Sequence, residues 1–264
     1  MEWLHVVILA VIQGLTEFLP VSSSAHLIFP SEVFGWPDQG LAFDVAMHVG
    51  SLLAVMIYFR HKIVDMTGAW FGSVLQRQHT RDSHLAWAVI WGTVPAGLAG
   101  LAFSGFIETE LRSITVIATT TLIFGILLGI ADRKGDSGIS ELTWKTIAVI
   151  AVAQAIALIP GTSRSGITMT AALLMGVNRK TAAEFSFLLS IPLIIAAGGL
   201  MSLELVESGV VVEWFKIAAA TAISAITAYI CIHYFLKLID SLGFMPFVVY
   251  RLFLAAGLFW LVFV

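Results

Sequence analysis

The stretch Gln13-Gly-Leu-Thr-Glu-Phe-Leu-Pro-Val-Ser-Ser-Ser-Ala-His26 places ionisable and hydroxyl side chains inside an otherwise apolar chain. Gln13 and Glu17 are four residues apart, so they share one face of a helix. Pro20 ends that helix, because a proline has no backbone N–H and disfavours the α conformation of the residue before it. Ser22 then fits the N-cap of a second apolar run.

Each arm of this stretch is too short to cross a membrane. A crossing needs about 20 apolar residues, and each arm offers about half that number. We therefore expect a re-entrant hairpin whose tip lies inside the membrane, where broken backbone is tolerated only within protein or beside a wet cavity. A carboxylate at that depth costs on the order of 3 kcal/mol, so function is the default interpretation of Glu17.

The composition excludes an ordinary soluble domain. The 264 residues are 59% hydrophobic and 12% charged, and the mean hydropathy is +0.95. These values are typical of a polytopic helical membrane protein, whose partner is the bilayer. A net charge of −3 without a basic run gives no reason to expect nucleic acid. Cys231 is the single cysteine, which excludes an internal disulfide and a cysteine-built metal site.

The rest of the chain contains six apolar segments of crossing length and a second interrupted stretch. The six segments are 42–60, 85–104, 112–131, 184–204, 214–236 and 246–264. The second interrupted stretch has apolar arms at 144–159 and 167–175 around Pro160-Gly-Thr-Ser-Arg-Ser-Gly166. We predict an all-α polytopic membrane protein with six transmembrane helices and two re-entrant helical hairpins.

The two hairpins resemble one another in sequence. Leu19-Pro-Val-Ser-Ser23 aligns with Ile159-Pro-Gly-Thr-Ser163, 140 positions later. Discontinuous helices in two matching halves are typical of an inverted-topology repeat. We expect one membrane domain over 1–264, with the first repeat in 1–131 and the second in 132–264.

Charge distribution gives an independent prediction of topology. Six crossings place the loops 60–84, 132–144, 177–183 and 237–245 on one side, which holds most of the basic residues, whereas the other side has Arg112 and Lys216. By the positive-inside rule, the basic side is cytoplasmic and both termini are periplasmic. The first hairpin then enters from the periplasm and the second from the cytoplasm, so that their tips meet.

The polar residues of the first hairpin have functional and structural interpretations. Gln13 and Glu17 either form a helix–helix hydrogen bond or hold Mg²⁺ or Ca²⁺, which prefer oxygen ligands. Ser22, Ser23 and Ser24 either cap a helix or, with its first-turn amides, bind an anion such as a substrate phosphate. His26 is either a structural histidine or a catalytic group one turn beyond Ser23.

Arg164 is the strongest signal in the second hairpin. Its fork of donors matches phosphate geometry, and the alternative is a buried ion pair with Glu17. Four neighbours at the same helix start are expected to bind phosphate with it: Thr162, Ser163, Ser165 and Gly166.

Further polar residues occur inside the apolar spans. Asp44 and His48 either line the cavity entrance or lie at the membrane interface. Arg251 is expected to snorkel or to pair internally. Ser186 and Ser190 favour helix packing over catalysis.

These motifs resemble a known family. Gln13 to Ser23 with His26, and Pro160 to Gly166, are similar to segments of the undecaprenyl pyrophosphate phosphatases of bacterial inner membranes, which confer bacitracin resistance. Ala183 to Pro192 and Pro246 to Arg251 also resemble family segments. The resemblance therefore covers nearly the whole chain.

The resemblance implies hydrolysis of undecaprenyl pyrophosphate to undecaprenyl phosphate and inorganic phosphate, which recycles the lipid carrier for cell-wall synthesis. It places the family's acidic motif on Gln13 and Glu17, and its serine, histidine and arginine on Ser23, His26 and Arg164. The divalent cation is then expected at Gln13 and Glu17, with glutamine standing at the first position of the acidic motif.

Several alternatives remain open from the sequence. The nucleophile is Ser23 activated by His26 or Glu17, His26 itself, or water, in that order of preference. The site is expected to face the periplasm, with the prenyl tail between helices. The rival function is a transporter or flippase of a polyprenyl phosphate, since tip-to-tip hairpins are also transporter architecture. The oligomeric state is undetermined, and a homodimer is one option.

Overall fold

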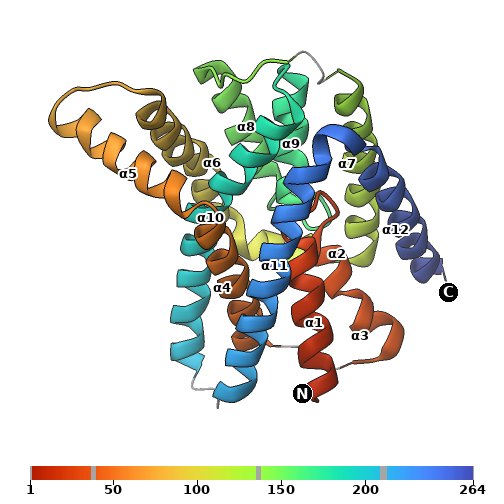
Figure 1. Ribbon diagram of the computed structural model, residues 1–264. Coiled ribbons are helices and arrows are strands. Elements are labelled where there is room, and N and C mark those ends of the chain that lie inside the picture. Colours follow the sequence, from red (N-terminus) through yellow and green to blue (C-terminus); the bar gives the residue numbers. More distant parts are fainter. Residues whose placement is uncertain (1, 37–39, 135–137, 209–212, 264) are drawn as a thin grey trace.

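The computed structural model describes residues 2–36, 40–134, 138–208 and 213–263 and is helical throughout its regular structure (Figure 1). Val264, the last residue of the final predicted span, lies outside these ranges. Six long helices are α4 (Leu41–Tyr58), α6 (Arg81–Glu110), α7 (Ile114–Lys134), α10 (Arg179–Ser208), α11 (Trp214–Leu242) and α12 (Met245–Phe263). The shorter helices are α1 (Trp3–Thr16), α2 (Ser23–Leu27), α3 (Phe29–Phe34), α5 (Arg60–Leu75), α8 (Trp144–Ile156) and α9 (Arg164–Leu174).

The six long helices are apolar and long enough to cross a membrane within the described ranges. This finding confirms the predicted all-helical, multi-pass membrane protein with six crossings. Several helices extend beyond the predicted apolar segments because their polar ends have other support. At the start of α6, for example, the Thr80 side chain accepts from the Ser83 N–H and the Ser83 side chain accepts from the Thr80 N–H, which forms a capping box.

Helix α5 corrects the sequence prediction, which treated 60–84 as a loop. Its residues are too polar for a membrane segment, so a search for apolar runs does not find it. The helix packs against α6, where Lys62 Nζ lies 2.8 Å from Asp82 Oδ1 and Trp87 Nε1 donates to Ser73 Oγ at 3.0 Å. Together, α5 and the start of α6 project from the side of the helical bundle (Figure 1).

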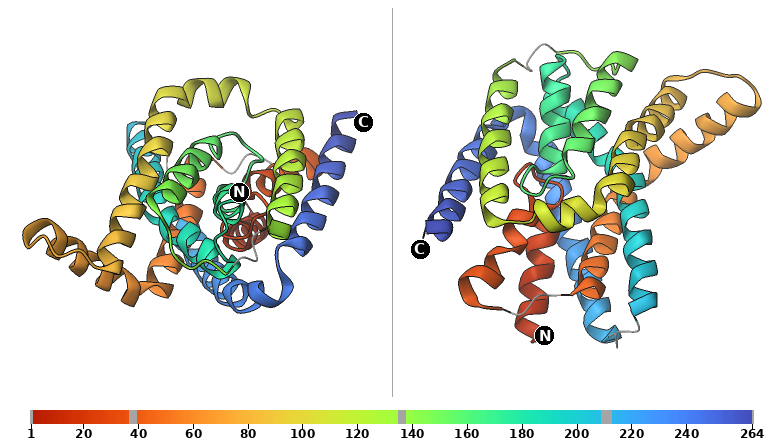
Figure 2. Two further views of the ribbon diagram at one scale, coloured as in Figure 1. Left: turned by 90° about the horizontal axis from the view of Figure 1, so that it is seen from above. Right: turned by 180° about the vertical axis from the view of Figure 1, so that it is seen from behind.

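Two pairs of short helices meet in the middle of the molecule. The pair α1 and α2 is joined by residues 17–22, which we call the first tip, and α8 and α9 are joined by residues 157–163, the second tip. In two opposite views, α1 and α2 lie in the lower half and α8 and α9 in the upper half (Figures 1 and 2). Hydrogen bonds join the tips: the Gly161 N–H donates to Ser24 Oγ at 3.2 Å, and Ser165 Oγ donates to the Leu19 carbonyl at 2.8 Å.

Both tips end in the same unusual backbone conformation. Ser22 precedes α2 with φ 73° and ψ 101°, and Ser163 precedes α9 with φ 70° and ψ 110°. A positive φ in a residue other than glycine is strained and persists only where its surroundings require it. The matching positions are therefore Ser22 and Ser163, one residue away from the alignment made on sequence alone.

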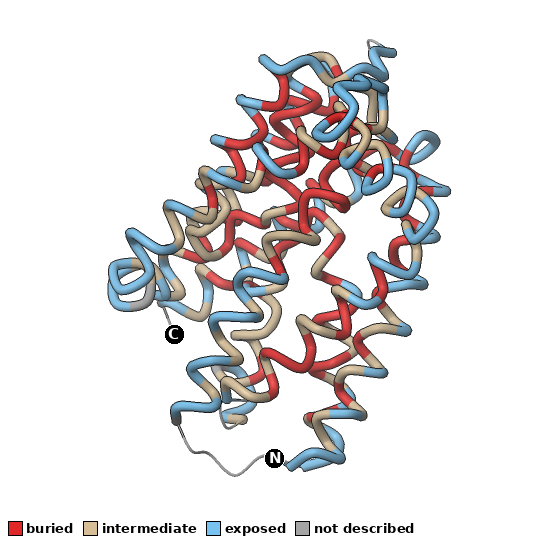
Figure 3. Tube along the Cα trace, turned by 90° about the vertical axis from the view of Figure 1, so that its left-hand side faces the viewer, coloured by how far each residue is buried: buried red, intermediate tan, exposed pale blue. Residues whose placement is uncertain are grey.

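The second pair of short helices is the centre of the core. Residues 165–173 of α9 are all buried, although the helix is too short to cross a membrane. Figure 3 shows the buried parts of the chain along the interior, with exposed parts on the outer faces of the long helices. The helix that follows the second tip is therefore enclosed by protein.

A glycine allows α4 and α11 to pack closely. Gly50 in α4 lies against α11, where a Cβ would overlap the Thr221 carbonyl and come within 2.9 Å of Ser224 Cβ. We expect Gly50→Ala to lower the Tm in detergent by about 5 °C or more, because an overpacked helix contact cannot relax around backbone atoms.

The matched control is Gly97→Ala in α6, where a Cβ would meet nothing within 4 Å in the described chain. This variant should keep or slightly raise the Tm, because alanine favours the helix. Equal Tm values for both variants would contradict the close approach of α4 to α11.

Candidate active site

A cavity of about 220 Å³ lies between the two tips, and we call it the tip cavity. Its polar lining includes six residues predicted from the sequence: Glu17, Ser22, Ser23, Ser24, Ser163 and Arg164. His48 from α4 also lines it, and its Nδ1 bonds to the Asp44 carbonyl at 2.8 Å. The structure thus brings polar groups that are about 140 residues apart in the chain to one cavity.

An ion pair between the two hairpins lines this cavity. Arg164 Nη2 lies 3.0 Å from Glu17 Oε1, and the two side chains are 11% and 9% exposed. Gln13 Nε2 donates to the other carboxylate oxygen at 2.9 Å, and Ser23 Oγ donates to the same oxygen at 3.3 Å. This is the buried ion pair that the sequence offered as an alternative for Arg164. Because the pair lines a cavity, it remains accessible to a competing anion.

Arg164 is oriented by its own surroundings as well. Its Nη1 donates to the Ser186 carbonyl of α10 at 3.0 Å, and its guanidinium carbon lies 5.9 Å from the centre of the Phe18 ring. The two hydrogen bonds to Glu17 and Ser186 use two of five N–H donors. Arg164 is also the first residue of α9, where the helix dipole and first-turn amides favour a negative charge.

The serine hydroxyls of the first hairpin have distinct partners. Ser22 occupies the N-cap position of α2, but its side chain bonds to Ser24 Oγ at 3.0 Å and makes no capping hydrogen bond within the described chain. Ser24 Oγ accepts from the second tip, whereas Ser23 Oγ donates to the Glu17 carboxylate. Ser23 is therefore the hydroxyl in position to pass a proton to a base.

His26 lies on the other side of the first hairpin. Its Nδ1 is 2.7 Å from the Ser22 carbonyl and its Nε2 is 2.6 Å from Tyr250 Oη, with the His26 and Tyr250 rings stacked. A carbonyl only accepts, so Nδ1 carries the hydrogen and a neutral Nε2 accepts from the tyrosine. His26 lines a separate, apolar cavity with Tyr250 and is not brought to Ser23 and Glu17.

Tyr250→Phe tests whether His26 acts in the reaction. His26 Nδ1 keeps its hydrogen bond to the Ser22 carbonyl when the 2.6 Å bond is lost, and His26 lies away from the tip cavity, so we expect kcat and KM to stay within about twofold of wild type. Tyr234→Phe, at an exposed tyrosine of α11, is the matched control and should keep both constants. A kcat about tenfold lower in Tyr250→Phe than in this control would show that His26 acts in the reaction.

Arg251 in α12 holds both tips together. It is fully buried and does not snorkel, so the expected internal pairing is what the structure contains. Its partners are backbone carbonyls: Nη1 donates to Pro20 at 3.3 Å and to Thr162 at 3.1 Å, and Nη2 donates to Gly161 at 3.0 Å. Nε also donates to the Thr121 carbonyl at 3.2 Å. One guanidinium thus binds the first tip, the second tip and α7.

Threonines of α7 complete the support of the second tip. Thr120 Oγ1 donates to the Pro160 carbonyl at 2.6 Å, and Thr121 Oγ1 donates to the Gly161 carbonyl at 3.3 Å. Sequence analysis did not select these residues or Tyr250. Two features of the sequence could have indicated them. Thr120 and Thr121 are adjacent hydroxyls, and Tyr250 stands beside Arg251, in spans that are otherwise apolar.

The remaining predicted site residues lie behind the tip cavity. Thr162, Ser165 and Gly166 are buried among the tips and are not part of the cavity lining. The Gly166 N–H donates to Ser163 Oγ at 3.2 Å, which caps α9. Gln13 lies behind Glu17, and its Oε1 is buried without a hydrogen-bond partner in the described chain.

The donors available for a metal ion are oxygens. Across 2–36, 40–134, 138–208 and 213–263, no three His, Cys, Asp or Glu side chains gather. Glu17 is the only carboxylate among the described residues that line the tip cavity. One carboxylate fits Mg²⁺ when water and phosphate oxygens supply the other ligands. The amide oxygen Gln13 Oε1, which has no hydrogen-bond partner in the described chain, is a further candidate oxygen ligand.

A larger cavity of about 700 Å³ lies elsewhere, between α5, α6, the segment 140–143 before α8, and α10. Lys62, His84 and Glu184 are among its lining residues, and none of the predicted site residues lines it. The smaller tip cavity is the better candidate because the ion pair, the hydroxyls and the start of α9 converge there.

Comparisons with known proteins agree with the motifs. The family described as bacitracin resistance protein BacA matches residues 6–257. The chain is 61% identical over 259 residues to the undecaprenyl-diphosphatase of Hahella chejuensis, covering 98% of this chain and 97% of that protein. It is 58% identical to the undecaprenyl-diphosphatase of Saccharophagus degradans, covering 99% of each chain. It is also 56% identical to undecaprenyl-diphosphatase 2 of Stutzerimonas stutzeri, covering 98% and 97%. The chain therefore belongs to the bacitracin resistance protein BacA family.

Proposed function

We propose that this protein hydrolyses undecaprenyl pyrophosphate to undecaprenyl phosphate and inorganic phosphate. This activity recycles the lipid carrier for cell-wall synthesis in the bacterial inner membrane and confers bacitracin resistance. The observation that carries the proposal is the Glu17–Arg164 ion pair, which lines a cavity beside Ser23 and the start of α9. The names of the relatives agree with this activity.

The proposed architecture is an inverted-topology repeat. Residues 1–131 form the first repeat and residues 132–264 the second, and each repeat contains one re-entrant hairpin. Three observations support it. The first arms, α1 and α8, have 14 and 13 residues, too few to cross a membrane. The tips approach from opposite halves of the molecule, and Ser22 and Ser163 share one backbone conformation.

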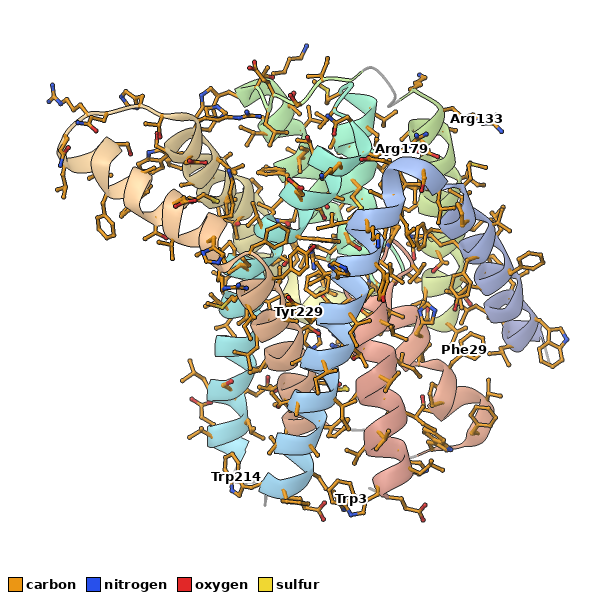
Figure 4. The ribbon with its side chains drawn as sticks, viewed as in Figure 1. Trp3, Phe29, Arg133, Arg179, Trp214 and Tyr229 are labelled. Atoms are coloured by element: carbon orange, nitrogen blue, oxygen red, sulfur yellow. The ribbon has the colours of Figure 1, made fainter. Side chains whose placement is uncertain are left out.

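The proposed orientation places the tip cavity and both termini on the periplasmic side. Figure 4 supports it: Arg133 and Arg179 lie at one end of the molecule, and Trp3 and Trp214 lie at the other. Basic residues are typical of the cytoplasmic end, and tryptophans anchor membrane interfaces.

The first step of the proposed mechanism is an exchange of partners at Arg164. A pyrophosphate entering the tip cavity competes with Glu17 for the guanidinium, whose planar fork suits phosphate oxygens. The arginine and the helix dipole at the start of α9 then stabilise the negative charge on the transferred phosphoryl group. The released Glu17 carboxylate, whose Oε2 lies 3.3 Å from Ser23 Oγ, becomes available as a base.

The second step is attack by Ser23. Its Oγ bonds to the terminal phosphorus while Glu17 takes the hydroxyl proton, and the bond from that phosphorus to the bridging oxygen breaks. Undecaprenyl phosphate leaves. Water then bonds to the phosphorus on Ser23, the Oγ–P bond breaks, Oγ regains the proton held by Glu17, and inorganic phosphate is released. The hydrogen bonds of both His26 ring nitrogens favour Ser23 over His26 as nucleophile, and direct attack by water remains the third alternative.

Gln13 and Glu17 are proposed to hold a divalent cation, Mg²⁺ or Ca²⁺, together with phosphate oxygens of the substrate. Such a cation supplies additional charge neutralisation at the pyrophosphate. We expect a chelator to reduce phosphate release strongly and added Mg²⁺ or Ca²⁺ to restore it. Full activity in chelator would contradict the cation but leave the phosphatase intact.

Phosphate release from undecaprenyl pyrophosphate by the detergent-purified protein tests the function. We expect Ser23→Ala to lower the rate of phosphate release by at least about 100-fold, because no other described hydroxyl donates to Glu17. The matched control is Ser31→Ala, whose hydroxyl bonds to the Ile28 carbonyl outside the tip cavity, and it should keep full release.

The rival function, a carrier of polyprenyl phosphate, is supported by the opposed tips. Lipid movement in vesicles that survives Ser23→Ala while phosphate release is lost would establish both activities. Movement without any release by wild type would replace the phosphatase with the carrier.

A further inference from the structure

The tip cavity has two chemically different walls. One wall consists of the polar groups of the two tips. The other is part of α10 and consists of Leu193, Ile194, Ala197, Gly198 and Met201, which we call the α10 wall. The phosphoryl chemistry proposed above uses the polar wall alone, so the α10 wall needs a separate explanation.

The α10 wall is one continuous helical face. Its residues are spaced at i, i+1, i+4, i+5 and i+8, so they form a stripe about 12 Å long. Beside the stripe, Ile195 and Leu200 are 51% and 53% exposed, which places this part of α10 at the lipid-facing surface of the protein. The stripe therefore leads from the phosphate-binding groups toward the membrane.

Gly198 leaves space in this wall. A Cβ built there would meet nothing within 4 Å in the described chain, so close helix packing does not explain this glycine as it explains Gly50. Gly199, the next residue, has the same open surroundings but does not line the tip cavity. A larger side chain at Gly198 would fill the tip cavity, whereas the same side chain at Gly199 would fill only lipid-facing space.

We propose that the α10 wall binds the first isoprene units of the prenyl chain, and that Gly198 keeps this path open. This inference rests on the proposed phosphatase function and names the part of the site that recognises a lipid rather than a soluble pyrophosphate. The isoprene carbons already lie in an apolar bilayer, so the wall contributes van der Waals contacts that depend on its shape and not energy from leaving water. The wall thus determines specificity without touching the phosphorus.

The apolar cavity beside His26 is the competing path for the chain. It has about 510 Å³ and is lined by Ile12, Phe29 and Tyr250 among others. It shares no lining residue with the tip cavity within the described chain, whereas the α10 wall is part of the tip cavity itself. A chain attached to a phosphate at Arg164 therefore reaches the α10 wall first.

The test compares Gly198→Leu with Gly199→Leu. KM for undecaprenyl pyrophosphate is measured by phosphate release, and inorganic pyrophosphate is used as a competing ligand that has no prenyl chain. We expect Gly198→Leu to raise KM about tenfold or more, with an inhibition constant for inorganic pyrophosphate within about twofold of wild type. Gly199→Leu should leave both constants unchanged.

An unchanged KM in Gly198→Leu would overturn the inference. If KM is then raised in Ile12→Trp, which fills the cavity beside His26, the prenyl chain binds in that cavity instead. Absence of phosphate release by wild type would instead defeat the proposed function, so the two failures are distinguishable.

Discussion

Arg164→Ala is expected to reduce kcat/KM for phosphate release by about 1,000-fold, or about 4 kcal/mol. The substitution removes the cation that faces the tip cavity and leaves the Glu17 carboxylate buried without its ion pair. A pyrophosphate would then meet an uncompensated negative charge. Both effects act on the same anion, so this is the largest loss of activity that we expect from a single change.

Arg164→Lys separates charge from geometry. A lysine keeps the charge but cannot bridge Glu17 and the Ser186 carbonyl with a planar fork. We expect a loss of about 100-fold, intermediate between alanine and wild type. Arg112→Ala, at an exposed arginine, is the control and should keep activity. Wild-type kcat/KM in Arg164→Ala would show that the tip cavity is not the site.

Arg251→Met is expected to have the largest effect on stability. Methionine fills part of the space but leaves the carbonyls of Pro20 and Thr162 without the donor that they now have, and the Gly161 carbonyl with Thr121 alone. Each buried polar group that loses its partner costs about 1–3 kcal/mol. We expect the Tm in detergent to fall by about 10 °C or more, with phosphate release lost in proportion to the fraction that unfolds or loosens.

Arg251→Lys should fall between wild type and Arg251→Met, because an ammonium keeps the charge but reaches fewer carbonyls. Arg133→Met, at the end of α7, removes an arginine at the surface and serves as the control. A Tm of Arg251→Met equal to that of this control would contradict the role of Arg251 as the link between the tips.

Much of the fold follows from hydropathy and proline positions. The six crossings were predicted because each is a long apolar run, and both tips were predicted because Pro20 and Pro160 interrupt apolar arms. Helix α5 was missed because its stability comes from packing on α6 and not from an apolar pattern. The backbone match of Ser22 to Ser163 was displaced by one residue, since sequence similarity does not report φ angles.

The site was predictable where chemistry stands out against an apolar background. Glu17 and Arg164 are predictable because charged groups are costly in a membrane, and Ser23 because it is one of three hydroxyls at one helix start; the structure brings them together. The position of His26 was not predictable, because three residues of spacing do not determine which way a ring turns in a helix of five residues. The links from Thr120, Thr121 and Arg251 depend on long-range packing.

We propose that the two tips form one catalytic unit, which a double-mutant cycle at Glu17 and Arg164 tests. Single-turnover phosphate release is measured for Glu17→Gln, Arg164→Lys and the double variant. Residues that act as a unit give strongly non-additive losses, so we predict that the double variant loses little more than the worse single variant. Losses that multiply would show that Glu17 and Arg164 act independently, and would contradict one catalytic unit.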